Sequence, residues 1–329
     1  MHLLLTGATG FLGYRTLEHF AHSNEITRIT AVGRSIKPSH QVNHPKVTYC
    51  LGDLSEERFV SHLFDDVDVV VHAAALSSPW GEPSHFHTAN VLPMQHLIKN
   101  VQEKNIKRFV YISTPSMYFD GNDRINIRET DPLPKRFINA YATTKRQAER
   151  LLEHSELPFI SLRPRALTGR GDTVIMPRLI RAYDEGRLKI IGNGKNVVDL
   201  TSVANVVDAI ELSINAPETS LGKHYNITNG EPVLLWQKID LILSSLGKTL
   251  TPKKIPYPLV KTIAQAMELR SKWTHQREPA LTVYGVGTLA KSFTMDISLA
   301  REHLGYVPRV STDEAIQEFV NWYMHHGSH

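Results

Sequence analysis

The sequence predicts an α/β protein built on a doubly wound parallel sheet, and three observations support this. Short apolar runs alternate with helical patterns through the first half of the chain. These runs are almost continuously apolar, which is typical of parallel strands covered by helices on both faces. A glycine-rich turn follows the first run, and glycine and proline become denser after Arg163-Pro164. We therefore expect one large α/β unit followed by a smaller, mixed C-terminal unit.

The elements of the large unit follow in order from this pattern. A strand over residues 3–5 leads into a helix over 12–22. Further strands are expected at 26–32, 47–51, 67–73, 108–113 and 159–162, and further helices at 56–64, 91–104 and 141–154. Right-handed crossovers then put the carboxyl ends of the strands, and any ligand bound there, along one edge. The predicted boundaries are 1–165 for this unit, with 195–215 returning to it, and 166–194 with 216–325 for the smaller unit.

Composition excludes several classes of protein. The chain has 329 residues, a formal charge of +4 and no basic run, so we do not expect nucleic-acid binding. A single cysteine, Cys50, cannot form an internal disulfide and fits the cytoplasm. No apolar run approaches the ~18 residues of a membrane span. The scattered histidines form no metal-binding motif, so no metal is expected. We expect no signal peptide, because a strand begins directly after Met1, and we expect a cytoplasmic monomer or homodimer.

The stretch 3–13 carries the most specific signal. Its turn contains Gly7, Gly10 and Gly13 between a strand and a helix. Such a turn directs backbone N–H groups and the positive end of the helix at one point, which suits the pyrophosphate of a dinucleotide. Gly7 permits the tight turn, Gly10 lets the backbone approach the ligand, and Gly13 lets helix and strand pack closely. The alternative is a plain glycine turn, but its position and context favour a Rossmann-type cofactor site.

Hydroxyl and amino groups follow the fifth predicted strand. Tyr141 and Lys145 lie four residues apart, on one face of a helix. A phenol titrates near ~10, but a nearby ammonium favours the phenolate and makes acid–base chemistry useful at neutral pH. Taken alone, this spacing also fits an ordinary surface tyrosine and lysine. Thr114, between Ser113 and Ser116 at the strand end, could bond a substrate carbonyl or serve turn chemistry.

These motifs, in this order, resemble those of the extended short-chain dehydrogenases/reductases, which include sugar-nucleotide epimerases, dehydratases and 3β-hydroxysteroid dehydrogenases. The resemblance runs from residue 3 to about residue 318. It implies that Thr114, Tyr141 and Lys145 are catalytic, with Asn90 near the active site. It further implies that the cofactor contacts Gly7, Thr9, Gly10, Phe11, Leu12, Gly13, Asp53, Leu54, Ala73, Ala74, Ala75, Tyr141, Lys145, Arg163 and Pro164.

Two segments narrow the resemblance to a branch of this group. Dehydratases carry Asp-Glu after the catalytic threonine, whereas Pro115-Ser116 stand here. Epimerases usually carry Arg-Asp where this chain has Val198-Asp199, and an apolar residue cannot bind a diphosphate. The stretches 163–172 and 191–199 are instead similar to sterol C4-carboxylate 3-dehydrogenases. The same 3β-hydroxysteroid dehydrogenase-like branch includes bacterial reductases of 2-alkyl-3-oxo acids.

The end of the second predicted strand indicates which nicotinamide cofactor is used. Relatives that prefer NAD place an acidic residue here to bind the ribose 2′-hydroxyl. This chain has Arg34 and Ser35, with Lys37 nearby, and these side chains could accept a 2′-phosphate instead. The alternative is a solvated loop arginine. We expect NADP(H) to be preferred over NAD(H).

The expected function is an NADP(H)-dependent oxidoreductase that interconverts a ketone and a secondary alcohol on a partly apolar small molecule, such as a 3-oxo acid or a sterol-like compound. Two alternatives stay open: a sugar-nucleotide epimerase with bound NAD, and a non-enzymatic NADP(H)-sensing protein. The apolar stripe over residues 258–273 either packs on the second unit or faces a substrate or a membrane surface. Arg165 and Arg170 either meet a substrate carboxylate or are solvated.

Overall fold

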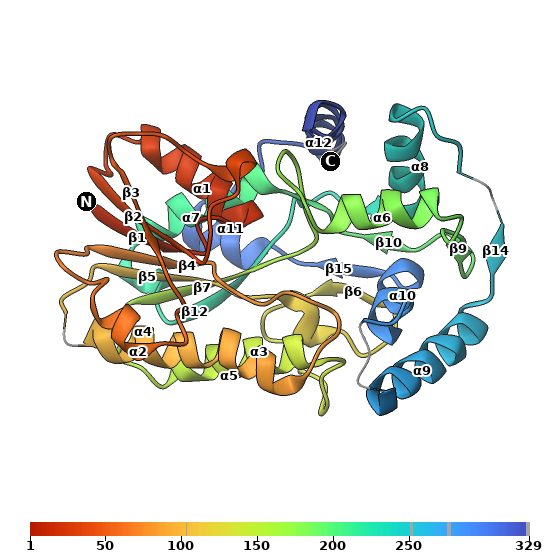
Figure 1. Cartoon of the computed structure of the whole chain (residues 1–329), viewed down its shortest axis with the longest axis horizontal. Helices are drawn as coiled ribbons and strands as arrows, with labels where there is room; N and C mark the ends of the chain where they lie inside the picture. The colour runs from red at the N-terminus through yellow and green to blue at the C-terminus, as the bar shows by residue number, and fades with distance from the viewer. Residues whose placement is uncertain (103, 251–252, 275–277, 327–329) are drawn as a thin grey trace.

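The computed structural model describes residues 1–102, 104–250, 253–274 and 278–326. Within them, a seven-stranded sheet with parallel neighbours forms the centre of the large unit, in the order β12-β7-β5-β4-β1-β2-β3 (Figure 1). These strands are β1 (His2–Thr6), β2 (Arg28–Gly33), β3 (Val47–Leu51), β4 (Val69–His72), β5 (Arg108–Ile112), β7 (Phe159–Pro164) and β12 (Lys223–Ile227). The reversal of strand order beside β1 puts a ligand-binding crevice at the carboxyl ends of these strands.

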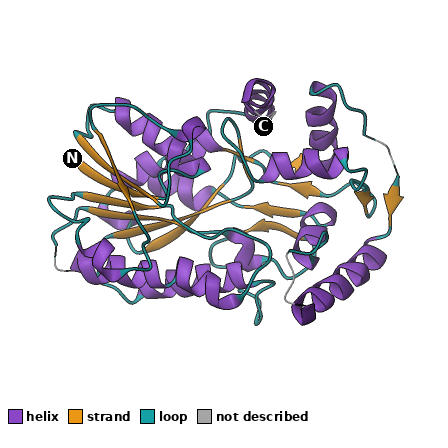
Figure 2. Cartoon of the chain, viewed as in Figure 1, coloured by secondary structure: helices purple, strands orange, loops and turns teal. Residues whose placement is uncertain are grey.

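Helices cover both faces of this sheet (Figures 1 and 2). One layer consists of α1 (Phe11–His22), α7 (Val203–Ile214) and α11 (Ser298–Leu304). The other consists of α2 (Glu57–Ser61), α4 (Leu92–Gln102) and α5 (Ala140–Glu153), with α3 (Pro83–Asn90) beside α4 and α5. Each layer forms its own core with the sheet: Leu17 and Ile210 are buried on one face, and Leu97 and Leu152 on the other. This two-sided burial explains the continuously apolar strands.

The second unit is built on a small mixed sheet. Its order is β13-β10-β15-β6, with an antiparallel pair between β13 and β10 and parallel pairs elsewhere. The strands are β6 (Arg124–Ile127), β10 (Val197–Val198), β13 (Val233–Leu234) and β15 (Phe293–Met295). Two-stranded pairs join β8 (Leu167–Thr168) to β11 (Thr201–Ser202) and β9 (Ile190–Ile191) to β14 (Lys254–Ile255). The surrounding helices are α6 (Ile175–Asp184), α8 (Leu235–Ser245), α9 (Tyr257–Thr274), α10 (Val283–Ala290) and α12 (Thr312–His326).

The predicted fold class is confirmed, and several details differ from the prediction. Strands β6 and β10 fall in ranges predicted for the large unit, but they pair in the small sheet. The helix predicted over residues 91–104 is observed as α4, and a separate helix, α3, precedes it. Residue 103 of the predicted helix lies outside the described residues, as do residues 251–252 and 275–277 of the second unit. Helix α2 is shorter than expected. The seventh strand, β12, comes from the range assigned to the smaller unit, because Tyr225 and Ile227 complete the buried edge beside β7.

Candidate functional site

The glycine turn brings three chain segments unusually close together. Gly7 has a φ of +73°, and a Cβ built on it would lie 2.6 Å from the backbone nitrogen of Ala74. A Cβ on Gly13 would lie 1.9 Å from the carbonyl oxygen of Gly7, so only glycine lets α1 pack this closely on β1. Gly10 is exposed and precedes α1 without capping it through a side chain. The first N–H groups of α1 therefore remain available to an anion, as a pyrophosphate site requires.

The other predicted cofactor residues lie along the same sheet edge. Arg34 and Ser35 follow β2, Asp53 and Leu54 follow β3, and the segment 73–75 follows β4. These strands are neighbours of β1 or of one another, and all are parallel, so their carboxyl ends converge. Other predicted cofactor residues lie around the glycine turn. The Thr9 side chain packs so closely on Gly33 that a Cβ added to Gly33 would collide with it, and the Phe11 ring lies near Gly171. This arrangement fits an extended dinucleotide.

Arg34 and Asp53 follow the neighbouring strands β2 and β3. Both side chains are exposed. The backbone N–H and the hydroxyl of Ser55 lower the pKa of Asp53, and the charge of Arg34 adds to this. Among the described residues, the Arg34 guanidinium forms no hydrogen bond or ion pair within 4 Å. Its charge is therefore available to a ligand.

Helix α5 begins beside the strand ends and presents the tyrosine in its first turn. Asn139 caps the helix: its side-chain oxygen accepts from the backbone N–H of Ala142 at 2.9 Å. Tyr141 follows the cap by two residues and so lies in the first turn of α5. Lys145 follows one turn later on the same face, as the spacing predicted.

Thr114 lies between β5 and the short helix η2 (Pro115–Tyr118). Its Oγ1 accepts from the backbone N–H of Ser116 at 3.2 Å and donates to Ser116 Oγ at 3.0 Å. Burial raises the pKa of Tyr141, a hydrogen bond with Thr114 partly offsets this, and Tyr284 adds to the rise. The threonine and the tyrosine predicted to act together are therefore in contact.

Lys145 is held at the end of β5. Its side chain is buried, its Nζ donates to the carbonyl oxygen of Ile112, and Nζ lies 4.3 Å from the centroid of the Tyr111 ring. Burial lowers the pKa of Lys145 to about 7, and the Glu149 carboxylate offsets part of this decrease. The groups that shift the pKa of Tyr141, named above, do not include Lys145.

A neutral, fully buried layer lies behind Lys145. The His72 ring stacks on Tyr111, with centroids 5.5 Å apart, and its Nδ1 lies 2.7 Å from the hydroxyl of Thr6. Burial lowers the pKa of His72 to about 3, and the charge of Lys145 contributes. The imidazole therefore stays neutral at physiological pH and adds no second positive charge beneath the ammonium.

Asn90 connects the loop after β4 to helix α5. Its side-chain oxygen accepts from the backbone N–H of Leu76 at 2.7 Å, and its Nδ2 donates to the Leu76 carbonyl oxygen at 3.2 Å and to Thr144 Oγ1 at 3.0 Å. Thr144 immediately precedes Lys145. Asn90 thus fixes the spacing between the predicted cofactor segment 73–75 and the catalytic helix.

Arg163, predicted to belong to the nicotinamide-facing segment, has its side chain in a buried ion pair. Its Nε and one terminal nitrogen each donate to a carboxylate oxygen of Glu149 at 2.8 Å, and its other terminal nitrogen donates to the Tyr118 hydroxyl. Burial would raise the pKa of Glu149, but Arg163 and His224 hold it well below its usual range. The backbone of Arg163 and the adjoining Pro164 remain as the parts of this segment that could meet a cofactor.

Glu149 also belongs to a group that resembles a metal site. Glu149, Glu153 and His224 offer ligand atoms within 4.8 Å of one another. Each carboxylate is already paired with an arginine, however: Glu149 with Arg163 and Glu153 with Arg146. These guanidinium groups neutralise the charge that would attract a cation. We interpret the group as an ion-pair network.

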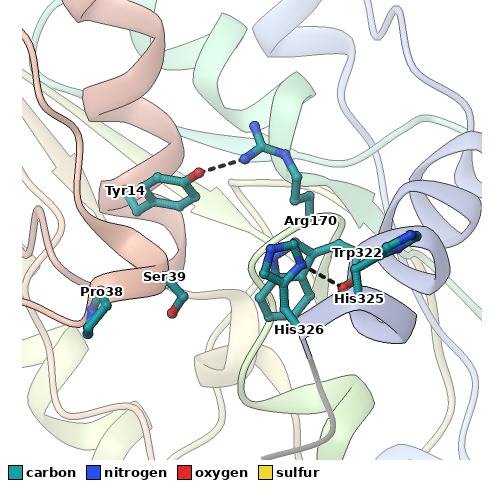
Figure 3. A pocket seen from close by; sticks show the side chains of 7 residues that line it. All are labelled: Tyr14, Pro38, Ser39, Arg170, Trp322, His325 and His326. Atoms are coloured by element: carbon teal, nitrogen blue, oxygen red, sulfur yellow. Dashed lines mark hydrogen bonds between the residues drawn. The ribbon is translucent and has the colours of Figure 1, made fainter.

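A separate cavity of about 650 Å³ lies between α1, the loop after β2 and α12 (Figure 3). Arg170 lines it and donates to the Tyr14 hydroxyl at 2.6 Å (Figure 3). It also donates to Glu18. Its guanidinium is therefore engaged with α1. Arg165, the other arginine considered for a substrate carboxylate, stacks over the Phe293 ring at 4.7 Å.

Three functional side chains escaped the sequence prediction. Asn139 carries the ordinary signal of a helix cap, an asparagine three residues before the first-turn N–H it binds, and could have been recognised. Ser116 was noted only as a strand-end hydroxyl. Tyr284 carries no local signal, because it reaches Ser116 across 168 residues of sequence, with the two side-chain oxygens 2.8 Å apart.

Comparison with known proteins identifies the family. The NAD dependent epimerase/dehydratase family matches residues 3–228. The chain belongs to this family, and the extended short-chain dehydrogenase/reductase resemblance inferred from the motifs is confirmed.

Individual relatives agree with that assignment. The chain is 32% identical to the uncharacterized protein YbjS of Escherichia coli, covering 99% of both chains. It is 31% identical to a 2-alkyl-3-oxoalkanoate reductase of Stenotrophomonas maltophilia, over 96% of this chain and 98% of the relative. It is 32% identical to 3beta-hydroxysteroid-dehydrogenase/decarboxylase isoform 1 of Arabidopsis thaliana, over 85% and 67%. The solved UDP-glucuronic acid 4-epimerase of Bacillus cereus, in complex with NAD, shares the fold at 21% identity, with a TM-score of 0.75 and 99% coverage of both chains.

The family and these named relatives together support a place among the NAD(P)-dependent dehydrogenases and reductases.

We predict that cofactor binding takes up a proton through Lys145. A pKa of about 7 leaves this amine largely neutral above pH 8, whereas an ammonium is the form that donates to ribose hydroxyls. The dissociation constant of NADPH should therefore rise as pH increases from 7 to 9. Fluorescence titration should detect this rise, and calorimetry in two buffers of different ionisation enthalpy should detect proton uptake. In Lys145→Met both effects should disappear, and their persistence would assign the proton to another group.

Proposed function

We propose that this protein is an NADP(H)-dependent oxidoreductase that interconverts a ketone and a secondary alcohol on a partly apolar substrate. The observation that carries the proposal is the meeting of Thr114, Tyr141 and Lys145 at the carboxyl end of β5, on the sheet edge that holds the glycine turn. The relatives named as a 2-alkyl-3-oxoalkanoate reductase and a 3beta-hydroxysteroid-dehydrogenase/decarboxylase support a 3-oxo acid or a sterol-like compound as the substrate class.

In this mechanism, a bound nicotinamide dinucleotide supplies the hydride for the carbonyl carbon. Tyr141 donates its phenolic proton to the carbonyl oxygen, so that ketone, hydride and proton balance to the alcohol. Thr114 donates a hydrogen bond to the same oxygen and fixes its position. Lys145, whose Nζ is held at the end of β5, would hold the ribose as an ammonium. Asn90 acts by holding the loop after β4 against α5.

The second unit supports an apolar rather than a nucleotide-diphosphate substrate. Val198, at the position where epimerases usually carry an arginine, is buried between Val233 and Phe293 in the small sheet. Burial raises the pKa of the neighbouring Asp199 to about 6, and its carboxylate accepts from the backbone N–H of Met295. This pair therefore serves the fold of the small sheet. We assign residues 166–194 and 216–325 to substrate binding, apart from β12 and α11, which belong to the large unit.

The reaction is tested with Tyr141→Phe. Loss of the phenolic proton donor should lower ketone turnover by about 10³-fold or more, whereas the NADPH dissociation constant should stay within about twofold. Turnover is measured by NADPH absorbance across a panel of 3-oxo acids and steroid ketones. The control is Tyr49→Phe, because that hydroxyl bonds only to the backbone of Val42 among the hydrogen bonds described and lies outside the predicted cofactor and substrate residues.

Retained turnover in Tyr141→Phe would remove this residue from the mechanism. Absence of turnover across the whole panel in the unaltered protein would favour the NADP(H)-sensing alternative. Exchange at a sugar stereocentre with UDP- or dTDP-sugars would favour the epimerase.

The preference for NADP(H) is proposed on the basis of Arg34. Its exposed guanidinium follows β2, and no acidic residue occupies positions 33–37. A 2′-phosphate there would form a charge-assisted hydrogen bond, whereas a 2′-hydroxyl would leave the guanidinium solvated.

We predict that Arg34→Ala weakens NADPH binding by about 10-fold or more and leaves NADH binding within about twofold, because a hydrogen bond to a charged group contributes about 1.5–3 kcal/mol. Paired fluorescence titrations measure both dissociation constants. Arg150→Ala, an exposed arginine on α5, is the matched control. An equal loss for both cofactors, or tighter binding of NADH by the unaltered protein, would contradict this role.

Helix α9 supports a reversible contact with an anionic membrane surface by an otherwise cytoplasmic protein. The apolar residues of α9 lie on two faces of the helix. Val260 and Ala264 are buried, while large apolar side chains on the outer face are exposed, namely Leu259 (54%), Ile263 (44%), Leu269 (57%) and Trp273 (81%). The exposed charged residues over 253–274 are all cations: Lys253, Lys254, Arg270 and Lys272. An apolar face with cations around it is the pattern of an interfacial helix. Among the described residues, no helix is long and apolar enough to span a membrane.

We predict that the protein sediments with vesicles containing ~30% phosphatidylserine and not with pure phosphatidylcholine, and that salt weakens the binding. Ile263→Ser/Trp273→Ser should abolish sedimentation without lowering the melting temperature, because both side chains are exposed. The control is Leu241→Ser/Met324→Ser, two exposed apolar positions on other helices. A role for α9 would be contradicted if the α9 variant, this control and the unaltered protein all sedimented with the vesicles to the same extent.

A further inference from the structure

Three hydroxyl groups form a chain from the catalytic threonine to the second unit. Thr114 Oγ1 donates to Ser116 Oγ at 3.0 Å, and Ser116 Oγ lies 2.8 Å from the Tyr284 hydroxyl. Thr114 and Ser116 are both buried, at 5% and 6% exposure. Water therefore has little access to replace a partner that either hydroxyl loses. The Tyr284 hydroxyl also acts on Tyr141, since it contributes to raising the pKa of that phenol.

Tyr284 is held in place by several contacts from its own unit. It is the second residue of α10, which Thr282 caps by accepting from the backbone N–H of Gly285 at 3.0 Å. Its ring meets the Phe119 ring edge-on, with centroids 5.8 Å apart. Gly287, one turn later, lies so close to Phe119 that an added Cβ would be 2.7 Å from a ring atom. The phenol is therefore fixed over η2.

The proposed reaction makes a demand that the Thr114–Ser116 bond does not meet by itself. A hydroxyl has one proton, and Thr114 directs its proton to Ser116. To donate to a substrate carbonyl, Thr114 must release Ser116, and Ser116 must find another donor. Tyr284 is within reach to be that donor. Ser116 can then donate its own proton to Thr114, so that Ser116 accepts from Tyr284 and donates to Thr114, and the Thr114 proton is free for the substrate.

We propose that Ser116 and Tyr284 are positioning residues that reverse the direction of this hydrogen-bond chain and thereby turn the Thr114 hydroxyl toward the substrate carbonyl. The chain then runs from Tyr284 to Ser116 to Thr114 to the carbonyl oxygen. No proton is transferred along it, because each hydroxyl only rotates. The proposal rests on the proposed function, since it gives Thr114 the role of donor. It adds a contribution from the second unit, which supplies Tyr284.

The test is a double-mutant cycle between Tyr284 and Thr114. Tyr284→Phe should lower kcat about 5- to 10-fold, the usual effect of one neutral hydrogen bond, while KM and the NADPH dissociation constant change less than twofold. In a Thr114→Val background there is no hydroxyl to orient, so Tyr284→Phe should cost nothing more. Ser116→Ala should reproduce the loss and should add nothing to Tyr284→Phe. Tyr49→Phe, whose hydroxyl bonds to the backbone of Val42 and which lies outside the predicted cofactor and substrate residues, should leave kcat unchanged.

Several results would overturn the proposal. An unchanged kcat in Tyr284→Phe would remove the tyrosine from the chain. The same loss in the presence and absence of the Thr114 hydroxyl would indicate packing, and an effect on KM alone would indicate substrate contact. If Tyr284→Phe unfolds at lower temperature, Ser116→Ala carries the same comparison in both backgrounds. A failure of the proposed function can be distinguished from a failure of this proposal. Retained turnover in Tyr141→Phe would contradict the proposed mechanism, whatever the effect of Tyr284→Phe.

Discussion

The buried ion pair between Glu149 and Arg163 is the interaction on which the geometry of the site depends. Glu149 lies one helical turn beyond Lys145, Arg163 is at the end of β7, and the same guanidinium binds Tyr118, four residues after Thr114. One set of charged hydrogen bonds therefore fixes the catalytic helix, the central sheet and the strand end that carries the threonine. Removing one partner from such a buried pair usually costs about 3–5 kcal/mol, because it leaves an uncompensated charge.

Around this pair, the site is arranged to limit positive charge. The Lys145 amino group lies over the Tyr111 ring, and its charge is balanced by the Glu149 carboxylate and by this electron-rich ring. The neutral His72 fills the space behind that ring. A lysine in this setting has a pKa near neutrality, so an anionic ligand can change its protonation with a modest amount of interaction energy. Electrostatic control of the site is therefore shared between helix α5 and the strands beneath it.

Local signals account for what the sequence predicted well. The apolar runs, the Gly7–Gly13 turn and the spacing of Tyr141 and Lys145 are each encoded within about a dozen residues, and they were enough for the sheet, the helix layers and the family. Features that depend on distant pairing were not predictable. The short β12 is a central-sheet strand because of β7, the Arg163 side chain turns to Glu149 because of α5, and Tyr284 reaches the site because of Phe119. The division of the α9 stripe likewise depends on where α10 packs.

The pairing of β6 with β15 has a consequence for how this architecture can be recombined. Strand β6 lies between β5 and α5 in the sequence, yet it is the edge strand of the small sheet, and its strand partner there is β15 near the end of the chain. The segment shared with the whole family ends at residue 228, well before β15. A fragment cut at that point would expose the backbone of β6 to pairing with other chains. The second unit is thus not a detachable module, and exchanging it between relatives would require β6 and β15 to be exchanged together.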